Sequence, residues 1–194
     1  MHQAAAILSE NAPVEAVHAR LIGLTRGLPN DDLFARMLAS RACGQGVLPS
    51  GLGLTPDDYT RMIARHFPGL GWPMPDFGDR DKAREEALLL DDLRRLLLSF
   101  RAGRDLSECW LADTVAAGCM GSDHLWQDLG LGCRADLSRL IGTNFPALAQ
   151  RNDKDMKWKK FLYKQLCVLE GLNVCRAPSC EECSDYDDCF GPED

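Results

Sequence analysis

The chain has 194 residues, 45% of them hydrophobic, which is enough to bury one core of ordinary size. Its formal net charge of -7 at pH 7 disfavours nucleic acid or an anionic membrane surface as the main partner. No apolar run approaches the roughly 20 residues of a membrane-spanning helix, and the start of the chain lacks the pattern of a secretory signal. We therefore expect a cytoplasmic protein that binds neither nucleic acid nor membrane.

Residues 1–172 are predicted to form one all-α domain of about seven to nine helices. Apolar residues recur there at helical spacing between Gly and Pro breaks, and no stretch alternates long enough to form a strand. The longest leucine-rich run is predicted to be the central helix. In chain order, the expected helices cover about 13–26, 31–43, 56–66, 81–101, 107–120, 123–129, 135–141, 146–150 and 155–170, with a long Pro- and Gly-rich connection over 68–78.

Residues 173–194 form a cysteine-rich tail that directly follows the last expected helix. Its four cysteines, Cys175, Cys180, Cys183 and Cys189, are separated by four, two and five residues. The segment is too short for a core of its own and is rich in Pro, Glu, Asp and Ser, so it is expected to be irregular without a metal. Thiolates that bind a metal convert coordination energy into folding energy. The four cysteines are therefore predicted to be the ligands of one metal site.

The spacing of these cysteines favours an iron–sulfur cluster over zinc and leaves disulfides third. Structural zinc sites usually combine two pairs with a two-residue gap, and here Cys180 and Cys183 make only one such pair. Gaps of four and two residues occur in plant-type ferredoxins, although their fourth cysteine lies far away. The residues alone thus leave two function classes open: an iron–sulfur electron carrier or redox sensor, and a zinc-stapled interaction module.

Two residues upstream of the tail are possible additional metal ligands. Cys119 and His124 lie five residues apart across a turn at Gly121, so both side chains can face a common space. The alternative is a packed thiol and a histidine bonded to the backbone at a helix start.

The last expected helix also carries lysines at three- and four-residue spacing, which form a basic face. This face either attracts an oxyanion or an acidic partner or is an ordinary solvated helix surface. Its members are Lys154, Lys157, Lys160 and Lys164, with Lys159 beside them.

Three segments of the C-terminal part resemble the NifQ family of nitrogen-fixation proteins. They are HLWQDLGL at 124–131, MKWKKFLYKQLC at 156–167 and DYDDCFG at 185–191, and the resemblance covers about residues 99–191. It implies an iron–sulfur cluster that contains molybdenum (Mo-Fe-S), with Cys175, Cys180, Cys183 and Cys189 as its ligands.

The resemblance also implies a function. The protein would carry molybdenum, with molybdate as the source, and donate it for nitrogenase iron–molybdenum cofactor assembly on the NifEN scaffold together with NifH. It would be a carrier rather than an enzyme. His124 and Cys119 then become candidate ligands of the molybdenum vertex.

Overall fold

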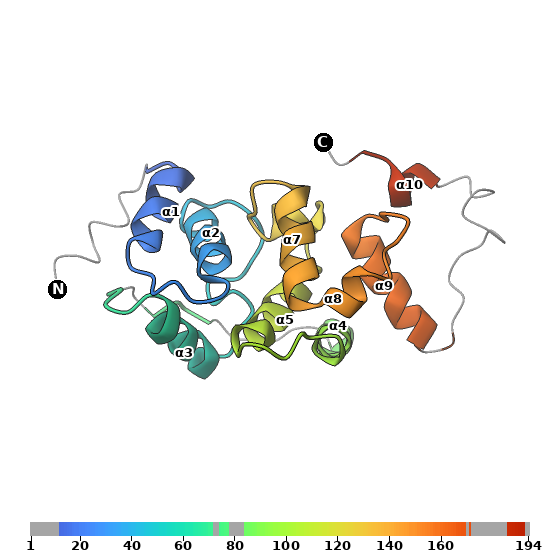
Figure 1. Cartoon of the computed structure of the whole chain (residues 1–194), viewed down its shortest axis with the longest axis horizontal. Coiled ribbons are helices and arrows are strands. Elements are labelled where there is room, and N and C mark those ends of the chain that lie inside the picture. Colours follow the sequence, from blue (N-terminus) through green and yellow to red (C-terminus); the bar gives the residue numbers. More distant parts are fainter. Residues whose placement is uncertain (1–11, 72–73, 78–83, 170, 172–185, 193–194) are drawn as a thin grey trace.

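The computed structural model describes residues 12–71, 74–77, 84–169, 171 and 186–192, and these residues form α-helices and no strand (Figure 1). The all-α prediction is confirmed: the described residues form nine helices within the predicted body and one short helix in the tail. None of the described helices is both long and apolar enough to cross a membrane. The helices are α1 (Val14–Ile22), α2 (Asp31–Ala42), α3 (Pro56–His66), α4 (Arg84–Ser99), α5 (Ser107–Gly118), α6 (Leu125–Asp128), α7 (Arg134–Asn144), α8 (Pro146–Ala149), α9 (Trp158–Leu169) and α10 (Tyr186–Phe190).

The start of α3 shows how the sequence fixes a helix boundary. The Thr55 hydroxyl oxygen accepts a hydrogen bond from the Asp58 backbone N–H at 3.1 Å, and the same hydroxyl donates to the Asp58 carboxylate at 2.8 Å. Pro56 occupies the first helical position, where its missing N–H costs nothing. The predicted capping arrangement at residues 55–58 is confirmed.

The most deeply buried helix is α5, and the prediction that the longest helix is central was wrong. Ten of the twelve α5 residues are buried. Helix α4 lies at the edge of the molecule (Figure 1) and leaves Leu88 56% exposed. Small residues explain the difference: a Cβ added at Gly118 would lie 2.7 Å from the Leu129 side chain, so neighbouring elements approach α5 closely.

Helix α6 is joined to α2 by a close backbone approach. The Ser40 hydroxyl on α2 donates to the Gly130 carbonyl at 2.6 Å, just beyond the end of α6. Gly130 has a φ of 68°, and a Cβ there would lie 2.5 Å from the Ser40 Cβ. Only glycine satisfies both conditions without strain, so the loop after α6 is fixed against the N-terminal half.

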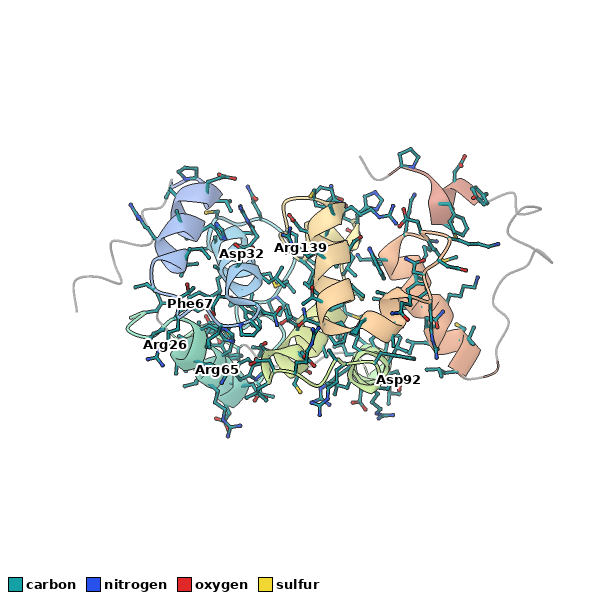
Figure 2. The ribbon with its side chains drawn as sticks, viewed as in Figure 1. Arg26, Asp32, Arg65, Phe67, Asp92 and Arg139 are labelled. Atoms are coloured by element: carbon teal, nitrogen blue, oxygen red, sulfur yellow. The ribbon has the colours of Figure 1, made fainter. Side chains whose placement is uncertain are left out.

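A buried histidine joins α3 to α2. His66 is fully buried, and its Nδ1 lies 2.6 Å from the Asp31 carboxylate. The rings of Phe34 and Trp110 lie 4.9 and 5.7 Å from the imidazole. Burial lowers the pKa of His66 below its ordinary value of 6.5, although the Asp31 carboxylate acts in the opposite direction. The neighbouring Arg65, labelled in Figure 2, donates to Asp105 at 2.7 Å and connects α3 to the start of α5.

Protonation of His66 is expected to make stability depend on pH. A lowered folded-state pKa means that the unfolded chain binds the proton more tightly, so the free energy of unfolding falls as the pH drops from about 7.5 to 5.5. Urea unfolding at several pH values would measure this fall. His66→Gln should flatten the dependence. An unchanged dependence in His66→Gln would contradict the assignment.

Candidate metal centre

Of the four predicted ligands, Cys189 lies within the described residues. It is on α10, and both Cys189 and Phe190 are partly buried against the core. Cys175, Cys180 and Cys183 lie outside the described residues, so their role as ligands remains a prediction. Within the described part of the chain, His, Cys, Asp and Glu side chains form no group of three that could hold a metal ion.

Helix α10 is attached to the residue that precedes α9. The backbone N–H of Lys157 donates to the Cys189 carbonyl at 2.7 Å, and the Lys157 ammonium donates to the Asp187 carbonyl at 2.9 Å. The rings of Tyr186 and Phe190 stack with centroids 4.6 Å apart. The Cys189 backbone is therefore fixed to the helical body by main-chain and side-chain bonds from one lysine.

The segment that carries the other three cysteines begins and ends at opposite ends of α9. Gly171 follows the C-terminal end of α9 with a φ of 70°, the left-handed conformation typical of a helix stop. Lys157, which holds α10, precedes the first residue of α9. The twelve residues of α9 correspond to about 18 Å between these attachments. The sequence predicted the first attachment, and the structure adds the second.

A pocket of about 550 Å³ lies beside α10, between the starts of α6 and α9. His124, the residue before α6, lines it, as does Gln127, whose side-chain oxygen accepts the His124 backbone N–H at 3.2 Å. Asp188 of α10 contributes to the same pocket. The structure thus places His124 in the same cavity as Asp188, the residue that precedes Cys189.

Lysines dominate the wall of this pocket that belongs to α9. Lys157, Lys159 and Lys160 line it, opposed by the exposed carboxylates of Asp123 and Asp188. The predicted basic face is therefore divided. Lys154 and Lys164 line a separate small hollow with Phe190.

A buried ion pair joins the start of α9 to α6. The Lys159 ammonium binds the Asp128 carboxylate, whose side chain is 1% exposed, and also donates to the Gly121 carbonyl at 2.9 Å. A Cβ at Gly121 would lie 2.4 Å from this carboxylate. Sequence reasoning missed the pair. The available signal was an acid inside the apolar run LWQDLGL, where a solvated side chain is not expected.

Cys119, the second candidate for an additional ligand, lies in the hydrophobic core and does not line the pocket. It is 2% exposed, and the Tyr163 hydroxyl donates to its backbone carbonyl at 2.9 Å. Burial raises the pKa of its thiol to about 12, although the nearby Lys159 ammonium opposes this shift. Metal ligation requires the thiolate, so these surroundings favour a packing role for Cys119.

A slightly larger pocket of about 580 Å³ lies between α4, α5 and the loop at 49–53. Its lining includes several carboxylates, among them Asp91 and Asp113, and no cysteine or histidine of the described part of the chain. Arg94 binds Asp113 there at 2.6 Å. Burial raises the pKa of Asp113, with the Arg94 charge acting against the shift. Among the described residues, none of the predicted ligands lines this pocket.

Together, these features define a class: an all-helical protein that carries a cysteine-rich, predicted metal-binding segment between two attachment points on one helix. Residues 33–191 match the family NifQ. "Protein NifQ" of Azotobacter vinelandii is 46% identical over 168 residues, which cover 81% of this chain and 86% of that protein. "Protein NifQ" of Rhodobacter capsulatus is 38% identical, covering 83% and 87%, and that of Klebsiella pneumoniae is 33% identical, covering 84% and 99%.

The chain therefore belongs to the NifQ family of nitrogen-fixation proteins. This confirms the resemblance found in the sequence and extends it toward the N-terminus. No solved structure matches the chain.

Replacing Lys159 by Met should strongly destabilise the fold. The substitution leaves the buried Asp128 carboxylate without its counter-charge, which typically costs about 3–5 kcal/mol. Urea unfolding would measure the loss. The double variant Lys159→Met with Asp128→Leu should recover part of it, because neither charge then remains buried. Lys164→Met, a matched change further along α9, should stay within about 0.5 kcal/mol of the parent. Equal unfolding midpoints for Lys159→Met and Lys164→Met would contradict a structural role for the pair.

Proposed function

We propose that this protein binds molybdenum within an iron–sulfur cluster and carries and donates it for the biosynthesis of the nitrogenase iron–molybdenum cofactor. The observation that carries the proposal is the set of four tail cysteines in a chain that belongs to the NifQ family. The hydrogen bond from Lys157 to the Cys189 carbonyl supports it, since Lys157 also lines the pocket that contains His124.

The number of thiols suits a mixed cluster. A cubane of three irons and one molybdenum requires a thiolate for each iron, and the molybdenum vertex accepts a further thiolate, an imidazole or oxygen ligands. The tail supplies four thiols, and His124 adds an imidazole in the pocket that Asp188, the neighbour of Cys189, also lines. In this arrangement Cys189 is the ligand whose backbone the helical body fixes.

A carrier must also release its cargo. The described residues on either side of the cysteine segment, Gly171 and helix α10, both lie against the helical body at α9. We propose that the protein acts in the cytoplasm as a carrier rather than an enzyme, takes its molybdenum from molybdate, and delivers it to the NifEN scaffold and NifH.

Two other functions make different predictions about the metal. An iron–sulfur electron carrier or redox sensor would hold iron without molybdenum and cycle reversibly by one electron. A zinc-stapled interaction module would be colourless and hold one tightly bound zinc. The four-two-five spacing of the cysteines fits a cluster better than the paired two-residue gaps of zinc sites.

Anaerobic purification with metal analysis and electron paramagnetic resonance tests the proposal. We expect molybdenum together with iron and sulfide in the parent protein, and loss of most of both metals in Cys180→Ser. Cys133→Ser, which alters an exposed cysteine outside the tail, should bind metals like the parent. Iron alone would favour the redox function, zinc alone the structural one, and unchanged metal content in Cys180→Ser would remove the assigned ligand set.

His124→Ala tests the molybdenum vertex separately. If the imidazole binds molybdenum, the variant should contain less molybdenum per iron and show an altered resonance spectrum. Cys119→Ala should change neither, because Cys119 lies in the core. Full molybdenum content and an unchanged spectrum in His124→Ala would exclude His124 as a ligand.

A further inference from the structure

The pocket beside α10 contains two lysine ammonium groups that form no ion pair within the described part of the chain. Lys160 is exposed, and within the described part of the chain its ammonium makes no hydrogen bond or ion pair. Lys157 donates its ammonium to a backbone carbonyl, which is neutral. Lys159 differs, because the buried Asp128 carboxylate compensates its charge. Two ammonium groups are therefore available to an anionic ligand.

The donors around the pocket come from two different parts of the fold. Lys157 immediately precedes α9 and Lys160 lies in its first turn, whereas His124 immediately precedes α6, more than thirty residues earlier in the chain. The positive end of the α9 dipole adds to the potential on the same side. Donors that converge from separate elements fit a compact anion with acceptor oxygens in several directions.

Two carboxylates work against anion binding. Asp123 and Asp188 also line the pocket, but both residues are exposed, so water and salt screen their charges. They lower the affinity for an anion without removing the donors. Weak, reversible binding suits a ligand that is held briefly and passed on.

We propose that this pocket binds a tetrahedral divalent oxyanion, held by Lys157, Lys160 and His124 next to the predicted cluster ligand Cys189. The proposal rests on the proposed function, which makes molybdate the oxyanion of interest. The pocket then collects molybdenum as its oxyanion before the metal passes to the predicted cluster. The volume of about 550 Å³ leaves room for water around the anion, and the lysine side chains reach it from the wall.

Isothermal titration calorimetry with sodium molybdate tests the pocket without the cluster. The full chain is used with Cys175→Ser, Cys180→Ser and Cys183→Ser, because this background prevents cluster assembly and removes thiols that react with molybdate. In this background, Lys160→Gln should weaken molybdate binding about tenfold, because it removes one charge-assisted hydrogen bond. Adding Lys157→Gln should weaken it further, and raising the salt concentration should do the same. Melting followed by circular dichroism checks that each variant is folded.

Lys164→Gln is the matched control, since it removes one charge from the same helix outside the pocket. It should bind molybdate like the parent background. If Lys164→Gln and Lys160→Gln weaken molybdate binding equally, the effect depends on the net charge of the protein and the proposed binding site is wrong. Absence of molybdate binding in the parent background would also contradict the proposal. Titrations with sulfate and phosphate identify the ligand: a preference for molybdate supports the link to molybdenum supply, and equal affinity for all three overturns that link.

Metal analysis of the protein with its cysteines intact separates this proposal from the proposed function. If the purified protein contains molybdenum and iron but the pocket does not bind molybdate, the oxyanion site is refuted and the proposed carrier function is not. If molybdate binding depends on Lys160 but the protein never contains molybdenum with iron, the carrier function is refuted and the oxyanion site is supported.

Discussion

The buried ion pair between Lys159 and Asp128 determines where the predicted metal-binding region lies. It joins the start of α9 to α6, and the same ammonium binds the carbonyl of Gly121 in the turn after α5. Because both charges are largely removed from water, each stabilises the fold only while the other is present. The pocket, the Lys157 bonds to α10 and the position of Cys189 all depend on this placement of α9.

Helix α9 consequently serves two purposes. Its apolar face, with Trp158, Phe161 and Leu162 buried, anchors it in the core. Its ends provide the attachment points of the cysteine-rich segment, through Gly171 on one side and Lys157 on the other. A segment fastened at both ends loses less conformational entropy when it closes around a metal than a free tail does, which favours binding. If the predicted metal site forms, the body would contribute to metal affinity through these attachments rather than through most of the ligands.

Much of the fold could be predicted because its determinants are local. The Thr55 cap, the Pro and Gly breaks and the helical spacing of apolar residues were sufficient to predict the nine helices of the body. The burial of α5 in place of α4 was not predictable, because it depends on small residues that allow neighbouring elements to approach from several sides. The candidate site was likewise predictable only in part. The cysteine spacing is local, whereas the separation of His124 from Cys119 is a property of packing.

The sequence by itself determined the helical class, the family and the four predicted thiol ligands, since periodicity, motifs and short spacing are written along the chain. Tertiary structure alone decided which charges meet. It buried Asp128 against Lys159, left Lys160 without an ion pair among the described residues, and placed Lys157 against α10. These contacts join residues about thirty positions apart, and long-range contacts of this kind follow from the packing of whole helices rather than from any pattern within one.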